Sequence, residues 1–136
     1  MSDCIFCAIV AGDAPASRIY EDDHVVGIMD ISPATRGHAL VLPKTHHKDL
    51  RDIPRDAAHR VLGGTLTVVE LIDAALSPAG FNLVHATDRA AWQTVFHFHI
   101  HVVPRYDPTE LAIPWPFDQP RADRAVLDEL ADAIRG

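Results

Sequence analysis

The spacing of hydrophobic and polar residues predicts most of the secondary structure of this chain. Apolar, β-branched and aromatic residues gather in short runs that end at turn-forming Asp, Ser, Pro or Gly residues, which is typical of strands. The segment 4–11 instead reads as one short helix that ends at Gly12. We predict five strands, over residues 18–21, 25–29, 38–42, 81–86 and 95–103.

A helical period lies between the third and fourth predicted strands. Pro54 suits the first helical position, and Ser77-Pro78 ends the segment. Apolar or small residues recur between them at spacings of three and four, at positions 58, 61, 62, 65, 66, 69, 72 and 76. Strands mostly in sequence with one inserted helix predict an α+β fold with an antiparallel meander.

The C-terminal part of the chain predicts a second helix after a proline-rich loop. The loop contains Trp115 and Phe117, which would either plug the core or close over the pocket of a neighbouring subunit. The helix is predicted over about 122–134, and its apolar residues recur at helical spacing. We expect the following side chains to pack inward: Ala125, Val126, Leu130, Ala133 and Ile134.

Length and charge limit the possible functions. A chain of 136 residues predicts a single domain over 1–136 with a core of its own. The net charge of −7 argues against sequence-independent nucleic-acid binding, which requires a basic surface. No apolar run reaches the roughly 18 residues of a membrane span, and the acidic N-terminus does not resemble a signal peptide. We therefore expect a cytoplasmic location, with neither nucleic acid nor membrane as a partner.

The strongest chemical signal is the stretch HFHIH at residues 97–101. Side chains alternate between the two faces of a strand, so His97, His99 and His101 are predicted to share one face. The intervening Phe98, Ile100 and Val102 would share the other face and pack on the long helix. A solvent-facing strand can carry histidines without function, but three in register on an apolar strand favour a functional site.

Two kinds of site fit three such histidines. Imidazole is a common ligand of transition metals, but alternate residues of a regular strand lie roughly 6.5–7 Å apart and converge on one ion only if the strand bends. Alternatively, a neutral imidazole can attack phosphorus while its neighbours fix its tautomer, bind phosphoryl oxygens and move a proton. The residues alone leave both interpretations open.

Longer segments resemble one known family. HFHIHVVP resembles the His-x-His-x-His-x-x signature of the histidine triad (HIT) superfamily of nucleotide hydrolases and transferases. CIFCAIVAGDAPASRIYEDD, MDISPATRGHALVLPKTHH and QTVFHFHIHVVPRY resemble further blocks of its bacterial members. The resemblance covers roughly the first hundred residues, to about Tyr106. It implies a HIT-like fold: a five-stranded antiparallel sheet with a long helix, dimerised through that helix and a shared sheet edge.

The resemblance also implies a reaction, the cleavage of a phosphoramidate or phosphoanhydride at the α-phosphate of a purine nucleotide. Within the implied catalytic group of His97, His99 and His101, His99 would be the nucleophile, giving a nucleotidyl-histidine that water resolves. His101 would bind phosphate and handle the leaving-group proton. Four other positions match the family's nucleotide contacts: Asp30 and Ile31 for ribose and base, Gln93 and Thr94 for phosphate. A nucleotide sensor without turnover and a hydrolase with metal on the triad are the alternatives.

The only two cysteines of the chain suggest a metal site. Bacterial relatives with a similar N-terminus often carry structural zinc, and the implied ligands here are Cys4, Cys7, His46 and His97. Two Cys and two His form a closed tetrahedral set, so His97 would serve Zn²⁺ while His99 serves phosphate. The family register favours His46 over His47. Inert thiols are the alternative, and a redox role is weaker because no βαβ pattern surrounds the pair.

One segment departs from the family pattern. Relatives usually have an Asn-x-Gly turn and a small residue before the Gln, where this chain has Ala86, Asp88 and Trp92. Ala86 offers no donor, Asp88 brings negative charge unless it turns outward or pairs with Arg89, and Trp92 can narrow the pocket. We expect an unusual substrate preference. His85 is a possible substitute donor, although by strand alternation it should share a face with Leu83.

Overall fold

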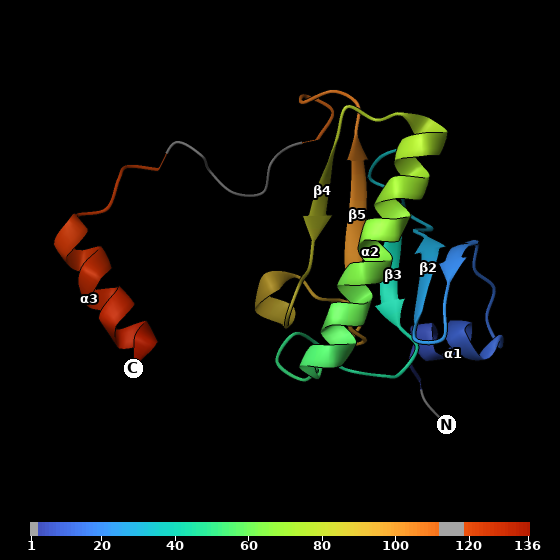
Figure 1. Cartoon of the computed structure of the whole chain (residues 1–136), viewed down its shortest axis with the longest axis horizontal. Helices are drawn as coiled ribbons and strands as arrows, with labels where there is room; N and C mark the ends of the chain where they lie inside the picture. The colour runs from blue at the N-terminus through green and yellow to red at the C-terminus, as the bar shows by residue number, and fades with distance from the viewer. Residues whose placement is uncertain (1–2, 112–118) are drawn as a thin grey trace.

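The computed structural model describes residues 3–111 and 119–136 of the chain (Figure 1). The sheet contains five antiparallel strands in the order β1-β2-β3-β5-β4. The elements follow one another as α1 (Ile5–Ala11), β1 (Arg18–Glu21), β2 (Val25–Met29), β3 (Ala39–Pro43), α2 (Arg55–Leu76), β4 (Gly80–Val84), η1 (Arg89–Ala91), β5 (Ile100–Arg105) and α3 (Arg124–Arg135). The predicted α+β fold with a five-stranded antiparallel sheet and one long helix is confirmed.

The connection through α2 determines where β5, which contains His101 and directly follows His99, lies in the sheet. The first three strands form the expected meander, each beside the strand that precedes it. Helix α2 has 22 residues, about 33 Å at 1.5 Å per residue, and crosses the sheet so that β4 forms at the far edge. Strand β5 then fills the gap between β3 and β4. It therefore has a neighbour on each side, which a strict meander would not provide.

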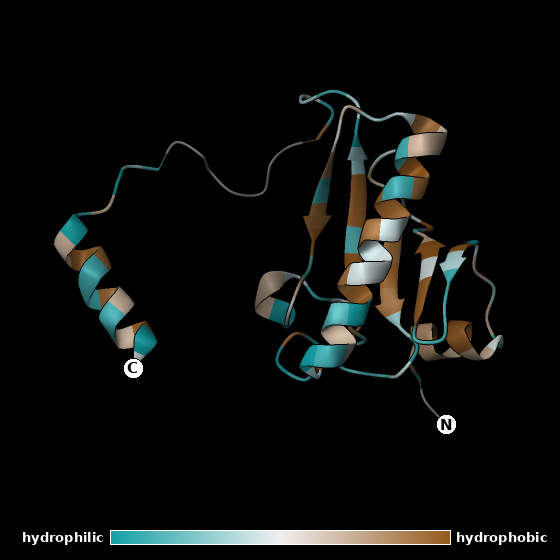
Figure 2. Cartoon of the chain, viewed as in Figure 1, coloured by the Kyte–Doolittle hydropathy of each residue, from teal (hydrophilic) through white to brown (hydrophobic). Residues whose placement is uncertain are grey.

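Helices cover both faces of the sheet. One hydrophobic cluster lies between the sheet and α2, and Phe98, Ile100 and Val102 pack there, as predicted. A second cluster lies under α1 on the opposite face and includes Phe6 and Leu42. Strands β2 and β3 are almost continuously buried because both of their faces are covered, and Figure 2 shows them as mostly apolar.

The close approach of α2 to β2 depends on two glycines. A Cβ atom on Gly64 would lie 2.8 Å from Val25 Cγ1, and one on Gly27 would lie 2.9 Å from Val68 Cγ2. Both distances are shorter than a carbon–carbon contact allows. The glycines let helix and strand pack without a gap, and this fixes the layer against which the β5 segment is placed.

The predicted strand over 95–103 was wrong for its first five residues. Strand β5 begins at Ile100, because the pairing with β3 ends at Val41↔Ile100 and the pairing with β4 ends at Val84↔His101. Ahead of it, the Phe98 N–H donates to the His47 carbonyl in a loop, at 2.6 Å. The alternation of side chains extends beyond the ladder, so the sequence pattern did not reveal where the ladder stops.

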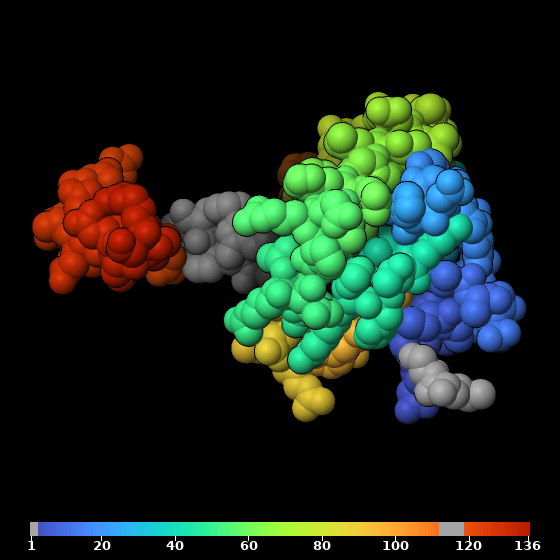
Figure 3. All heavy atoms as spheres, turned by 60° about the horizontal axis from the view of Figure 1, so that its bottom comes forward, coloured from blue at the N-terminus to red at the C-terminus, as the bar shows by residue number. Residues whose placement is uncertain are grey.

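Helix α3 also differs from its prediction. Its bounds are close to those expected, but none of its residues is buried, and Val126 and Ile134 are 50% and 84% exposed. Figures 1 and 3 show α3 apart from the sheet and α2. The inward packing expected of Ala125, Val126, Leu130, Ala133 and Ile134 is therefore wrong for a single chain. An amphipathic pattern specifies an apolar face but not what covers it. Trp115 and Phe117 lie outside the described residues.

Candidate active site and metal site

His97 directs one ring nitrogen toward both cysteines. Its side chain is fully buried, and its Nε2–H donates to the Pro43 carbonyl at 2.8 Å. The lone pair is therefore on Nδ1, which lies 3.3 Å from Cys4 Sγ and 3.5 Å from Cys7 Sγ. Burial, above all, lowers the pKa of His97 to about 4. A neutral imidazole whose lone pair points toward two sulfurs has the protonation state and orientation that metal binding requires.

His46 completes a four-membered group. Its Nδ1 lies 3.2 Å from His97 Nδ1 and 3.3 Å from Cys7 Sγ. Tetrahedral zinc with Zn–N of roughly 2.0–2.1 Å and Zn–S of about 2.3 Å requires edges of about 3.3 Å between nitrogens and about 3.6 Å between nitrogen and sulfur. The ligand atoms of all four residues lie within 4.8 Å of one another. The donor set and its spacing fit zinc.

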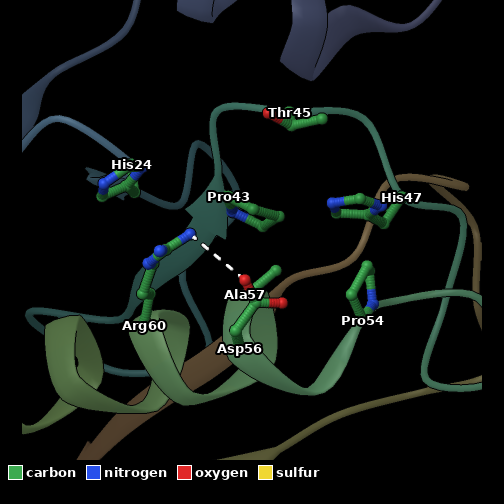
Figure 4. Close-up of a pocket in the computed structure, with 8 residues that line it drawn as sticks. All are labelled: His24, Pro43, Thr45, His47, Pro54, Asp56, Ala57 and Arg60. Carbon is green, nitrogen blue, oxygen red and sulfur yellow. Dashed lines mark ion pairs between the residues drawn. The ribbon is translucent and has the colours of Figure 1, made fainter.

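The structure also separates His46 from His47. His47 lies instead in a second pocket of about 180 Å³ at the N-terminal end of α2, which Figure 4 shows in close-up. That pocket is also lined by His24, and Asp56 and Arg60 form an ion pair in it, at 3.7 Å. Of the two adjacent histidines, only His46 joins the cysteines and His97.

His99 has the hydrogen bonding of a nucleophile. Its Nδ1 lies 2.7 Å from the His97 carbonyl, which can only accept, so Nδ1 carries the proton. The neutral ring therefore has its lone pair on Nε2. Burial lowers the pKa of His99 below its usual value, against the opposing effect of this hydrogen bond. Phe6 packs edge-on against the ring with centroids 5.1 Å apart, which fixes the ring's plane.

His101 is placed by a chain of donors from the segment that precedes β3. The Ala34 N–H donates to His38 Nδ1 at 3.0 Å, so neutral His38 carries its proton on Nε2. That nitrogen lies 2.9 Å from His101 Nδ1, which accepts, and leaves a donor on His101 Nε2. Burial, then His99 and His38, lower the pKa of His101 to about 4, while Asp30 opposes the shift. The sequence predicted only a structural hydrogen bond for His38.

Asp30 lies beside both of these histidines. Its Oδ2 is 3.4 Å from His38 Nε2 and 3.8 Å from His101 Nδ1, and its Oδ1 accepts from the Ser32 N–H at 2.8 Å. Burial lowers the pKa of His38, and the carboxylate opposes this. Asp30 therefore acts on the electrostatics of the triad as well as lining the cavity next to it.

A cavity of about 500 Å³ opens beside His99 and His101. Its size is within the range of small-ligand pockets. Apolar side chains from α1, the following loop and β2–β3 form one part of its wall, and His99, His101, Asp30 and Thr94 form a polar part. Ile31 also lines it and is 95% exposed. An apolar compartment next to convergent polar groups suits a base and its phosphate.

Gln93 and Thr94 differ in their availability to a ligand. Gln93 is buried, and its amide donates to the carbonyls of Lys48, at 2.8 Å, and Val95, at 3.1 Å. Its Oε1 accepts from the Asp88 N–H at 2.7 Å. With both amide hydrogens engaged, Gln93 braces the loop before the triad. Thr94 is exposed and lines the cavity.

The unusual turn keeps its negative charge out of the cavity. Asp88 has a φ of 72°, a backbone conformation that favours glycine. Its carboxylate accepts from the Arg89 N–H at 2.7 Å and lies 3.8 Å from Arg51, so it faces outward. Trp92 has a φ of 74°, is 72% exposed and lines the cavity together with Ala86. The departures therefore change the cavity's rim and leave the triad unaltered.

Comparisons with known proteins agree with this geometry. Residues 11–108 match the HIT domain. The chain belongs to the HIT family. Adenosine 5′-monophosphoramidase hnt1 of Schizosaccharomyces pombe is 31% identical over 137 residues, covering 97% of this chain and 98% of that protein. Adenylylsulfatase HINT3 of Arabidopsis thaliana is 32% identical over 133 residues, covering 98% of this chain and 66% of the plant protein.

Solved HIT-family structures share the fold. A HIT family protein from Bacillus anthracis is 36% identical, with a TM-score of 0.91 over 98% of this chain and 96% of that one. A zinc-bound histidine triad family protein from Mycobacterium smegmatis is 41% identical, with a TM-score of 0.77 over 96% and 97% of the two chains. Among the described residues, no helix combines the length and the apolar character needed to cross a bilayer.

Proposed function

We propose that this HIT protein cleaves a phosphoramidate or phosphoanhydride at the α-phosphate of a purine nucleotide. The observation that carries the proposal is the tautomer of His99. Its Nδ1 proton is held by the His97 carbonyl, so the Nε2 lone pair of a buried, neutral ring lines a cavity of nucleotide size. The names of the yeast and plant relatives, a monophosphoramidase and an adenylylsulfatase, support the same class of reaction.

In the first step His99 displaces the leaving group. The Nε2 lone pair attacks the α-phosphorus, and a nitrogen–phosphorus bond forms while the bond to the leaving nitrogen or oxygen breaks. The leaving atom keeps the electron pair and takes a proton from His101. The negative phosphate and Asp30 both favour the protonated form of His101 in the complex, against the burial that lowers the pKa of His101 in the free protein.

In the second step water resolves the nucleotidyl-histidine. The water oxygen attacks phosphorus, the nitrogen–phosphorus bond breaks, and His99 recovers its lone pair. The water proton passes to His101, which restores the starting state. Asp30 and Ile31 are assigned to ribose and base, and Thr94 to phosphate. Gln93, whose amide is engaged elsewhere, is assigned to shaping the loop that carries Thr94.

We assign structural Zn²⁺ to Cys4, Cys7, His46 and His97. The ion would neutralise the two thiolates and tie the N-terminus to the triad segment. The spacing of the ligand atoms and the zinc-bound relative support this assignment. We also assign the protein to the cytoplasm, where reducing conditions would keep both thiols able to bind metal.

We further propose a homodimer. Helix α2 exposes Leu62 and Leu66, at 48% and 57%, and strand β4 at the sheet edge exposes Leu83 and Val84, at 48% and 40%. Exposed apolar side chains of this kind favour association. Sedimentation analysis should give twice the mass of one chain, and a monomer at micromolar concentration would contradict this part of the proposal.

The test of the reaction uses adenosine phosphoramidate and a dinucleoside polyphosphate. We expect release of a mononucleotide and a covalent adduct trapped on His99, both lost in His99→Ala. A second candidate is a nucleotide-binding protein without turnover, favoured by Ala86 and by the engaged amide of Gln93. Binding of AMP by calorimetry without release or adduct would support that candidate and contradict the hydrolase.

A further inference from the structure

The backbone carbonyl of His99 lies beyond the end of both strand ladders. Strand β5 pairs with β3 as far as Ile100 and with β4 as far as His101, so His99 precedes the last paired residue on each side. Its carbonyl nevertheless has a partner, the Nδ1 atom of His85, at 2.9 Å. A side chain therefore takes the place that a backbone N–H of β4 would occupy in a longer ladder.

Three contacts fix the ring of His85. A carbonyl only accepts, so His85 carries its proton on Nδ1 and has its lone pair on Nε2. That lone pair faces Thr87 Oγ1 at 2.7 Å, and Thr87 Oγ1 in turn accepts from the Leu50 N–H at 3.1 Å, which directs the hydroxyl proton to the ring. The ring also stacks on Phe98, with centroids 4.5 Å apart and planes 30° apart. One tautomer and one orientation satisfy all three contacts.

We propose that His85 is a positioning residue that fixes the orientation of the His99 ring. This inference rests on the nucleophilic role proposed for His99. Two hydrogen bonds hold that residue, one from its own ring to the His97 carbonyl and one from His85 to its backbone carbonyl. The first fixes the ring relative to the segment, and the second fixes the segment relative to β4. Without the second, the peptide after His99 can rotate and carry the ring with it.

The same arrangement explains how the cavity can open beside the nucleophile. If β4 continued to residue 86 to pair with His99, its backbone would follow β5 and fill the space where Ala86 now lines the cavity. Strand β4 instead ends at Val84 and the chain turns away. His85 keeps the carbonyl of His99 bonded across the opening. The ladder can therefore stop early without leaving a buried acceptor unsatisfied.

The test compares His85→Phe with His85→Asn. Phenylalanine keeps a ring on Phe98 but has no donor, whereas the amide nitrogen of asparagine can occupy the place of Nδ1. We expect His85→Phe to lower kcat by about 10- to 100-fold with little change in KM, because a misplaced nucleophile loses rate more than binding. In His85→Asn, kcat should stay within about threefold of the wild-type value. An unchanged kcat in His85→Phe, or equal losses in both folded variants, overturns the proposal.

The ring ¹⁵N signals of His99 test the role of His85 independently of whether the protein catalyses the proposed reaction. The ring ¹⁵N signals of His99 should shift in His85→Phe and stay close to the wild type in His85→Asn, whether or not the protein turns over substrate. If the wild type forms no adduct, the reaction proposal fails and these signals alone decide the role of His85. If His85→Phe does not fold, Thr87→Val takes its place, and an unchanged His99 signal in that variant overturns the inference.

Discussion

Residues 95–99 and 100–105 belong to one apolar run of sequence, but different forces hold them. The second half, β5, is fixed by backbone ladders to β3 and β4. The first half lacks a ladder and is held mainly by side chains. Gln93 bonds the Val95 carbonyl, His97 bonds the Pro43 carbonyl and contacts Cys4, Cys7 and His46, and His85 bonds the His99 carbonyl. A ladder gives every residue the same geometry. Side-chain anchors allow neighbouring histidines to have different partners and different tautomers.

The largest effect should come from His99, the proposed nucleophile, in the first half. His99→Ala is expected to lower kcat at least 1,000-fold, on the order of other nucleophile deletions, and to abolish the covalent adduct. Its control is His59→Ala on the exposed side of α2, which should leave kcat unchanged. Residual adduct in His99→Ala would place the nucleophile elsewhere.

The next largest effect should come from a substitution that removes an anchor of residues 95–99 and leaves the ladder of residues 100–105 intact. His97→Ala removes a proposed zinc ligand and a buried ring. It should lower the free energy of unfolding by about 3 kcal/mol and abolish the proposed binding of zinc. Hydrogen exchange should rise over 95–99 more than over 100–105. Val102→Ala, which truncates a buried residue of the ladder half, should cost about 2 kcal/mol but retain zinc. Equal loss of protection in both halves of His97→Ala would contradict this contrast.

The pH dependence tests the donor chain at the start of the ladder. His101 should titrate near pH 4 by NMR, below its ordinary value of 6.5. Because the unfolded chain then takes up the proton first, His101 makes stability fall as pH drops from about 6.5 to about 4, with no further loss below that. Asp30→Asn should lower the pKa of His101 further, since the carboxylate favours the charged ring. Titration near 6.5 would contradict the buried, neutral assignment.

The smallest effect concerns the backbone of the loop before the anchored half. Trp92→Gly relieves a positive φ at an exposed residue, and should change the free energy of unfolding by about +0.5 kcal/mol after the entropy cost of glycine. Ala91→Gly, one residue earlier in η1, where φ is not positive, should destabilise by a similar amount. Thermal unfolding measures both. If Trp92→Gly is less stable than the wild type, the indole makes a contact that stabilises the fold by more than the positive φ destabilises it.

The sequence predicted the elements that depend on local pattern. The bounds of β1 and β2 agree with the structure, and α2 occupies the segment with the helical period. Alternation also placed Phe98 and Val102 on the helix side. The end of the β5 ladder was missed because alternation of side chains continues where backbone pairing stops.

Site features that depend on neighbouring strands were harder to predict. His38 meets His101 only because β3 and β5 are adjacent, and no local pattern encodes that pairing. The outward turn of Asp88 likewise depends on its positive φ and on Arg51, 37 positions away along the chain. By contrast, the four residues that the family register implies as metal ligands lie together, although His46 and His97 are far from the cysteines in sequence.

The strand order has a consequence for how a newly made chain completes its fold. Strand β5 leaves the ribosome after every other strand of the sheet, yet it lies between two of them. Until it emerges, β4 has no neighbour in the described part of the chain, and β3 has an open edge. A chain whose synthesis stops before residue 100 therefore has an incomplete sheet, which is exposed to proteases and to pairing with other chains. The sheet is completed and the segment with His99 is fixed in the same step, so a chain that stops before β5 lacks the assembled triad.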